Sequence, residues 1–356
     1  MEISTEVSNK IRNISFICAL LVVLIHVPPI ENGLWFNDFV SYWVKHGLSI
    51  IAVPVFFIIS GFLLGKHVNE QGWYGKAVKS RIKSLVIPFF VLNILYYPVF
   101  VLFHYIGVKY FGADGSNRIM DLTLSNALYL MGFFPWGGNA IGPLWYVRAL
   151  FYLVLISPIF VWVIKKGRLV ALAFIICLLL LWCVQGPRSF LAGVGNAPFA
   201  FCGLTFNVNC LVYFTIGLAC SLYAPKALPR YAAFIVVPLA LCTLAVHKQG
   251  VFSGNEMKVL MSFVTTILLA LALWCITPAK KWPAVFTANA FPIYALHNVV
   301  LYFLPIPMKA FGAWDIILST GGFIPIFVIT VLIAVVVAEL AKRYCPTFAR
   351  LAFGGR

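Results

Sequence analysis

The sequence predicts an all-α, polytopic integral membrane protein with about ten transmembrane helices in one domain, residues 1–356. Three observations lead to this class. The 356-residue chain is 62% hydrophobic and only 10% charged, and its mean hydropathy is +0.98. Apolar runs long enough to cross a hydrocarbon core of about 30 Å recur along the chain. The connections between these runs alternate in basic content, as they do in multi-span proteins.

The apolar runs define the expected spans in order. They cover residues 13–29, 39–65, 85–107, 141–164, 169–185, 205–223, 231–246, 257–276, 284–304 and 315–340. The first run is not expected to be a cleaved signal peptide, because no small-residue cleavage site follows it and Pro28 and Pro29 come next. The longest outer connection, 108–140, contains a semi-apolar stretch, 122–134, for which a re-entrant or interfacial helix is expected.

Basic residues are distributed unequally between the two sides of these spans. Of the 26 Lys and Arg residues, 18 fall before the first span, after the even-numbered spans or at the C-terminus, and six fall in the other connections. The positive-inside rule therefore predicts that both termini are cytoplasmic. This topology accounts for the net charge of +16, so nucleic acid is not an expected partner, whereas anionic membrane lipid is.

Most of the nine cysteines lie within apolar runs, where we expect them to pack as small apolar residues. No CxxC pair and no Cys/His spacing indicates a metal site, so no metal cofactor is expected. Cys202 and Cys210 flank one outer turn and could pair, but packing is the expected role for them as well.

His26 is the most informative residue, because it is the only ionisable group in the apolar run 14–27. An ionisable side chain at membrane depth is costly and is therefore a candidate functional group. Arg12 marks the inner end of the run, which puts His26 about 21 Å along the helix, in the outer half of the membrane. A single membrane histidine could equally serve to hydrogen-bond a neighbouring helix, and this interpretation stays open.

Other polar residues fall at the same predicted depth. His297 lies in the outer half of the ninth span, and Arg148 lies in the first two turns of the fourth. Lys45 and His46 lie about two turns into the second span, and we expect Lys45 to snorkel to the outer surface. Together with His26, these residues predict a polar cavity in the outer half of the membrane.

A second group of basic residues is expected at the inner ends of the first three spans. It comprises Arg12, Lys76, Lys79, Arg81 and Lys83. Their role in setting the topology is sufficient to explain them. Alternatively, they bind phosphates presented from the cytoplasm, since Arg and Lys are the usual phosphate ligands.

Five short segments, in order along the chain, resemble acyltransferase family 3 membrane proteins. Residues 56–62, FFIISGF, resemble the family's Phe-Phe-x-x-Ser-Gly-Phe signature. Residues 144–148, LWYVR, resemble its Leu-Trp-Phe-x-Arg segment, and residues 293–297, IYALH, resemble its Ile-Tyr-Leu-Leu-His motif. Residues 14–26 resemble its first span, and residues 81–88 resemble the basic segment that leads into its third.

The resemblance implies acyl transfer across a bacterial inner membrane. In this family an acyl group, commonly acetyl, passes from cytoplasmic acyl-CoA to a hydroxyl of a glycan or lipid-linked acceptor at the outer face. Arg12 and His26 would be the arginine and histidine of the first span, with His26 catalytic. The family usually spaces these residues by ten, and in this chain Ser15 occupies the place of the arginine. Arg12 lies one turn deeper, about 40° from the direction of His26.

The resemblance and the predicted depths together assign candidate roles. His26 acts as general base, and Arg148 and His297 assist it. Ser60 and Gly61 are small, and the side chain that Gly61 lacks is expected to leave room for the pantetheine arm of acetyl-CoA, the expected co-substrate. The remaining candidates are Arg12, Lys79, Arg81 and Lys83 for the donor, and Trp145, Tyr146, Trp136 and Tyr294 for a polysaccharide or lipopolysaccharide acceptor.

Two other classes stay open at this point. A multi-span solute transporter would use the same polar cavity, and it predicts solute flux without dependence on acyl-CoA. The chain shows no internal repeat, which disfavours transporters built from inverted repeats. A non-catalytic membrane scaffold or sensor predicts that His26→Ala leaves function intact.

Overall fold

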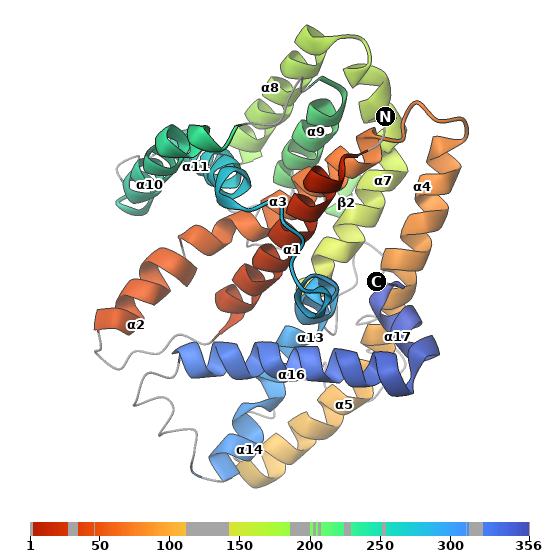
Figure 1. The fold of residues 1–356 in the computed structure, drawn as a ribbon. Helices are drawn as coiled ribbons and strands as arrows, with labels where there is room; N and C mark the ends of the chain where they lie inside the picture. Colours follow the sequence, from red (N-terminus) through yellow and green to blue (C-terminus); the bar gives the residue numbers. More distant parts are fainter. Residues whose placement is uncertain are drawn as a thin grey trace.

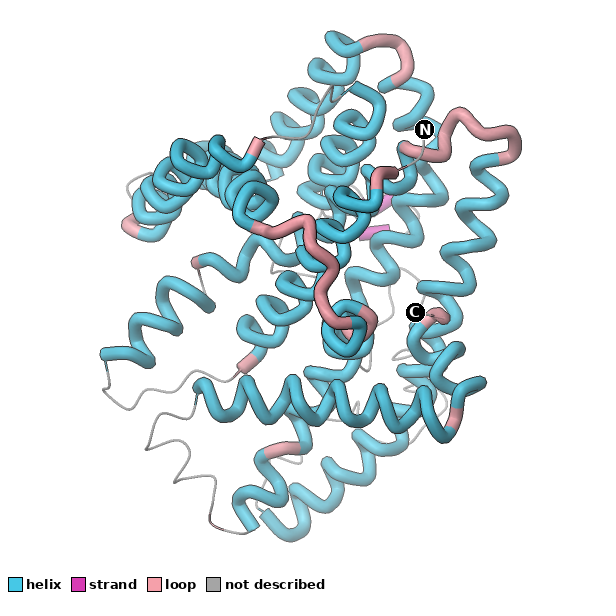
Figure 2. The backbone as a smooth tube through the Cα atoms, in the orientation of Figure 1, coloured by secondary structure: helices cyan, strands magenta, loops and turns pink. Residues whose placement is uncertain are grey.

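The computed structural model describes residues 3–27, 35–45, 47–111, 142–185, 200–201, 204–205, 208–223, 229–250, 254–310, 312 and 323–355. These residues are almost wholly helical, as Figure 2 shows. The described strands are β1 (Ala200–Phe201) and β2 (Leu204–Thr205), which pair antiparallel with Ala200 opposite Thr205. The all-α prediction is confirmed.

The helices follow one another as labelled in Figure 1. The first part of the chain forms α1 (Thr5–His26), α2 (Trp35–Phe39), the π-helix η1 (Val40–Lys45), the 3-10 helix η2 (Leu48–Ile51), α3 (Ala52–Gly65), α4 (Trp73–Arg81), the π-helix η3 (Ile82–Val86) and α5 (Ile87–Phe111). The rest forms η5 (Gly142–Leu144), α7 (Trp145–Ile164), α8 (Arg168–Gln185), α9 (Val208–Tyr223), η7 (Arg230–Ala232), α10 (Ala233–Lys248), α11 (Asn255–Ile276), α12 (Ala284–Thr287), α13 (Ala290–Phe303), α14 (Pro305–Ala310), α16 (Phe323–Tyr344) and α17 (Pro346–Phe353).

Eight helical segments in the described part of the chain are long and apolar enough to cross a membrane. They are Thr5–His26, Val40–Gly65, Trp73–Val99, Gly142–Ile164, Arg230–Lys248, Asn255–Ile276, Ala290–Lys309 and Phe323–Tyr344. The predicted spans 169–185 and 205–223 fall on α8 and α9, which are shorter apolar helices. The segments indicate a multi-pass membrane protein, while the count of ten and the cytoplasmic side of the termini stay predictions.

The third predicted span begins earlier than expected. The basic stretch before it is not a loop, because α4, η3 and α5 form one continuous helical run from Trp73. A π-helix adds a residue to a helical turn, so η3 changes which side chains share a face above and below it.

α1 occupies the centre of the helical assembly, with α3, α11 and α13 around it (Figure 1). Its N-terminal half is fixed by polar side chains that bind the chain just after α11. Asn13 Nδ2 donates to the carbonyl oxygens of Pro278 and Lys280 at 3.0 and 2.9 Å. Lys10 is buried, its Nζ donates to Trp274 O at 2.9 Å, and it lies 5.0 Å from the Trp274 ring centroid. Trp274 O is one of the carbonyl groups that the end of α11 leaves free, and the other two belong to residues that follow the helix.

α3 and α9 form the most extensive helix–helix contact in the described part of the chain. A Cβ at Gly61 would collide with the carbonyl oxygen of Phe214, and a Cβ at Gly217 would collide with that of Ile58. The two backbones therefore touch, which only small residues permit and which is a common way to pack helices in membranes.

Candidate functional site

His26 and His297 lie side by side, although 271 residues separate them in the sequence. Their ring centroids are 4.9 Å apart, with the ring planes at 58°. His26 is in the last turn of α1 and is exposed, whereas His297 is in the middle of α13 and is fully buried. The pair results from the packing of α13 along α1. The structure thus brings together two of the three predicted catalytic residues.

The hydrogen bonds of the two rings define their tautomers. His26 Nδ1 lies 2.8 Å from Val22 O, and His297 Nδ1 lies 2.7 Å from Tyr294 O. A carbonyl oxygen can only accept, so each Nδ1 carries the proton, and Nε2 of each neutral ring keeps its lone pair. His297 Nε2 is buried and has no hydrogen-bond partner among the described residues. Each ring thus presents Nε2 as an acceptor, which is the state that a general base requires.

Lys45 joins this pair, contrary to the expectation that it would snorkel outward. Its side chain is buried, and Nζ donates to the carbonyl oxygen of Val27, the residue after His26. The ammonium is near enough to His26 for an electrostatic interaction between them. Lys45 ends the π-helix η1, and two residues later a Cβ at Gly47 would collide with the carbonyl oxygen of Trp43. A π-turn followed by a close backbone approach directs Lys45 inward.

A cavity of about 280 Å³ lies between α1, α3, the junction of α4 with η3, α7 and α13. Its polar lining consists of Ser15, Ser60, Arg81, Tyr146 and Tyr294, and its apolar lining of Ile11, Phe56, Ile59, Leu63, Leu85, Leu150, Ala290 and Phe291. Ser15 is eleven residues before His26, so the end of the cavity that Ser15 lines is about 16 Å along α1 from His26.

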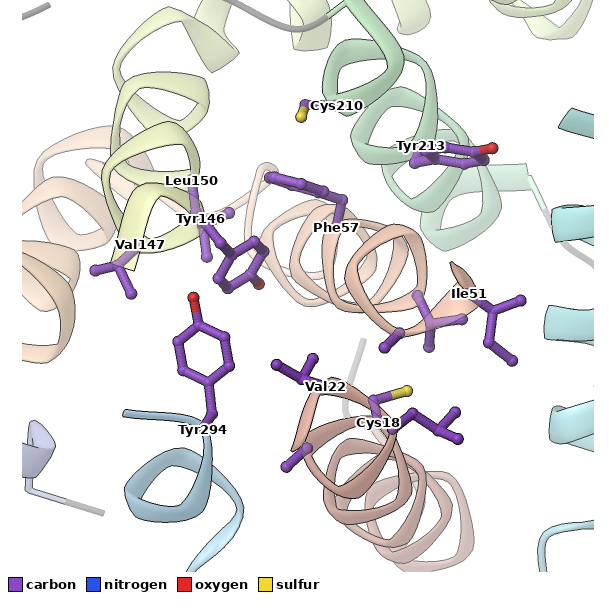
Figure 3. Packing of buried hydrophobic residues seen from close by; sticks show 14 of the residues in the cluster. Cys18, Val22, Ile51, Phe57, Tyr146, Val147, Leu150, Cys210, Tyr213 and Tyr294 are labelled. Carbon is purple, nitrogen blue, oxygen red and sulfur yellow. The ribbon is translucent and has the colours of Figure 1, made fainter. Parts of the chain in front are cut away.

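Two tyrosines connect the cavity with the histidines. Figure 3 shows Tyr294 reaching from α13 toward Tyr146 of α7, and their ring centroids are 5.8 Å apart. Tyr294 OH donates to Pro143 O, and Tyr146 OH lies 3.4 Å from Ser60 Oγ. The Tyr294 ring is also 6.2 Å from the His297 ring. Both tyrosines, predicted to bind the acceptor, therefore lie where the cavity approaches the histidine pair.

The predicted inner basic group does not form one site. Arg81 lines the cavity, whereas Lys79 and Lys83 are exposed and line a separate, shallow groove on the surface of α4 and η3. On α1 it is Ser15 that faces the cavity, and Arg12 is exposed. Of the four basic residues predicted to bind the donor, the structure places only Arg81 in the cavity.

The room expected beside Gly61 is not there. Ser60 lines the cavity, but Gly61 is on the opposite side of α3, where the backbone of α9 fills the space that a side chain would take. This glycine therefore serves the contact between α3 and α9, and it does not widen a path for the donor.

The remaining candidates lie beside the site or outside the described residues. Arg148 is half-buried, interacts electrostatically with Tyr152, and lies about 200° around α7 from Tyr146, so it does not line the cavity. Trp145 is half-buried, with its ring 6.5 Å from that of Phe57. Trp136, His46 and the stretch 122–134 lie outside the described residues.

Among the described residues no group of three or more His, Cys, Asp or Glu side chains is placed to hold a metal ion. Cys210, expected to pack as a small apolar residue, is a buried free thiol, and Cys202 lies outside the described residues.

One of the comparisons with known proteins identifies the family of this chain. A protein-family model described as an acyltransferase domain matches residues 11–339, nearly the whole chain and every helix that contributes to the histidine pair and the cavity. No curated protein and no solved structure matches the chain. On the strength of the family match, this chain belongs to acyltransferase family 3.

Proposed function

We propose that this protein transfers a short acyl group, acetyl in the first instance, from cytoplasmic acyl-CoA to a hydroxyl of a cell-surface or lipid-linked glycan. Transfer takes place at the outer face of a bacterial inner membrane. The observation that carries this proposal is the histidine pair, in which both Nδ1 atoms bind backbone carbonyls and both Nε2 atoms keep their lone pairs.

His26 is the general base, because it is the exposed member of the pair and an acceptor can reach it. Its Nε2 takes the proton of the acceptor hydroxyl as the hydroxyl oxygen attacks the thioester carbonyl carbon. A carbon–oxygen bond forms, the carbon–sulfur bond breaks, and the thiolate recovers the proton from His26 to leave as CoA thiol. His297 is fully buried, so it supports His26 without reaching the acceptor itself.

The donor arm enters through the cavity that Arg81 lines. Its guanidinium is the one cation among the described cavity residues, and the hydroxyls of Ser15, Ser60 and Tyr146 lie around the same space. Arginine binds phosphates and carbonyl oxygens through several fixed donors, which suits a long polar arm. Arg81 thereby provides the guanidinium for the donor, because the polar residue that α1 contributes to the cavity is Ser15 and not an arginine.

The acceptor approaches from the other end of α1, where His26 is exposed. Tyr146 and Tyr294 border the route between the cavity and the histidines. Trp145, Trp136 and Arg148 remain candidates for holding a sugar ring or orienting it, since aromatic side chains and guanidinium groups suit such a surface.

Inverted membrane vesicles that contain the native acceptor test the proposal. Labelled acetyl-CoA is supplied outside, at the cytoplasmic face, and wild type is compared with His26→Ala at matched expression. We expect label in the glycan with wild type and a loss of about a hundredfold or more in the variant. His67→Ala is the matched control, because His67 is an exposed histidine that bonds Glu70 at 2.6 Å and lowers the pKa of that carboxyl.

Two outcomes would count against the proposal. Equal labelling by His26→Ala and wild type would exclude His26 as the base. Wild-type vesicles that label nothing but exchange solute without acetyl-CoA would favour the transporter class.

A further inference from the structure

We propose that Lys45 is a further catalytic residue of the transfer described above, and that its ammonium binds the oxygen of the thioester carbonyl while His26 takes the acceptor proton. The inference rests on the proposed function. The negative charge in question develops on the carbonyl oxygen when the acceptor oxygen adds to the carbonyl carbon, and it disappears when the carbon–sulfur bond breaks.

The first support is the unused capacity of the ammonium. Lys45 is 5% exposed, and a buried ammonium is costly unless its charge and its donors are compensated. It has three N–H donors, and one of them binds Val27 O. The ion pairs among the described residues involve Glu70 and Glu339, and none includes Lys45. Two donors of this amine therefore have no partner among the described residues and remain available to an anionic atom.

The second support is where this charge lies. Val27 follows His26 directly, so the ammonium is held at the carbonyl of the residue next to the proposed base. The two side chains interact electrostatically. A base and a cationic donor at one point are what acyl transfer to a hydroxyl needs, because one removes a proton while the other stabilises the new oxyanion.

The third support is the local backbone that directs Lys45 inward. π-Helical turns are rare, and they occur frequently at functional sites. Here the π-helix η1 ends at Lys45, and Gly47 allows the Trp43 carbonyl to approach closer than any side chain would permit. A lysine that only snorkelled to the surface would need neither feature.

The competing explanation is that Lys45 only caps α1, because Val27 O is one of the carbonyls that a helix end leaves free. Lys10 provides the matched case. It is also buried and donates to a backbone carbonyl, but it packs over the Trp274 ring, some 16 residues along α1 from His26. A purely structural lysine should affect folding alone.

The test measures kcat and KM for acetyl-CoA in the vesicle assay, with thermal stability in detergent, for Lys45→Gln, Lys45→Arg and Lys10→Gln. Glutamine keeps an N–H for the carbonyl and removes the charge, so Lys45→Gln should fold. We expect its kcat to fall about a hundredfold, the usual effect of losing one oxyanion donor, with KM changed little. Lys45→Arg should restore at least about a tenth of the wild-type kcat, because it retains the charge. Lys10→Gln should lose stability and keep kcat within about twofold.

The outcomes separate the two proposals. If wild type transfers acetyl and Lys45→Gln is folded with kcat within about threefold of wild type, the Lys45 inference is overturned and the histidine mechanism stands. If Lys45→Gln and Lys45→Arg lose kcat equally, or only in proportion to the loss of folded protein, Lys45 is a structural cap. If wild type shows no CoA-dependent transfer, both proposals fail together.

Discussion

The two ends of α1 hold buried polar groups of similar chemistry in different surroundings. At the N-terminal end, Lys10 and Asn13 donate to carbonyl oxygens of residues 274–280, and Lys10 also lies over the Trp274 ring, while Asn13 Oδ1 has no hydrogen-bond partner among the described residues. At the C-terminal end, Lys45 binds a single carbonyl, and His297 Nε2 has no hydrogen-bond partner among the described residues. Buried polar groups in native proteins are nearly always paired, so a group left unpaired needs its own explanation.

This difference gives a way to distinguish structural from functional polar residues in a membrane core. Burial does not separate the two ends, since Lys10 is 8% exposed and Lys45 is 5% exposed. Unpaired polar atoms do not separate them either, because Asn13 Oδ1 and His297 Nε2 both lack a hydrogen-bond partner among the described residues. The neighbouring groups do separate them: Lys10 lies over the Trp274 ring at a joint between α1 and the chain after α11, whereas Lys45 lies beside two imidazole rings that can take a proton.

The largest effect is expected from His26→Gln, which tests whether the C-terminal end of α1 is catalytic. Glutamine retains size and polarity but has no basic nitrogen, so transfer should fall by about two to four orders of magnitude. Thermal stability should change little, because the His26 ring is exposed. Single-turnover transfer at saturating acetyl-CoA measures the chemical step. A variant as active as wild type would show that His26 is not the base.

The next effect concerns the cavity between the two ends. Arg81→Gln removes the cation from the cavity lining, and a hydrogen bond to a charged group contributes about 1.5–3 kcal/mol. KM for acetyl-CoA should therefore rise about tenfold or more, with kcat nearly unchanged. Lys79→Gln and Lys83→Gln are the controls on the surface groove, and a similar rise in KM for either would contradict the division of the basic group.

A smaller effect, on stability alone, is expected at the N-terminal end. Asn13→Ala removes two hydrogen bonds to the carbonyls of Pro278 and Lys280 and should cost about 1–3 kcal/mol. The midpoint of thermal unfolding in detergent should fall, whereas kcat per folded molecule should stay at the wild-type value. A selective loss of kcat in this variant would show that the N-terminal end is not only a joint.

The smallest effect is expected from Arg12→Gln. Arg12 is exposed and does not line the cavity, whereas Ser15 does. Transfer and KM should remain within about twofold of wild type, since a solvated charge contributes little. A tenfold rise in KM for acetyl-CoA would return Arg12 to the donor site that the family resemblance implies.

The class of fold and the meeting of His26 with His297 could be predicted from the sequence. Hydropathy reports on length and burial in lipid, and counting residues from a basic end gives depth, which is why His26 and His297 were expected together. The rotation of side chains about the helices could not be predicted as well. When a helix is apolar on every side, its sequence does not indicate which face lines a cavity and which face packs against protein. In α3, for example, Ser60 lines the cavity and Gly61 contacts α9, a difference that the sequence alone does not indicate.

Two further features depend on contacts that a linear pattern does not record. The π-helices η1 and η3 alter the phase of the turns that carry Lys45 and Arg81, and regular spacing takes no account of them. The partner of Gly61 is Phe214, more than 150 residues later, so the use of this glycine could only be seen in the assembled helices.

The contact between α3 and α9 also has a consequence for how the protein is made. α9 has 16 residues, about 24 Å of helix, which is shorter than the hydrocarbon core of about 30 Å. Most of its residues are buried in protein, and the missing side chain of Gly217 lets the backbone of α9 contact that of α3. We therefore expect α9 to be inserted by docking onto α3, a helix made about 150 residues earlier, because the bilayer alone would select so short a helix weakly.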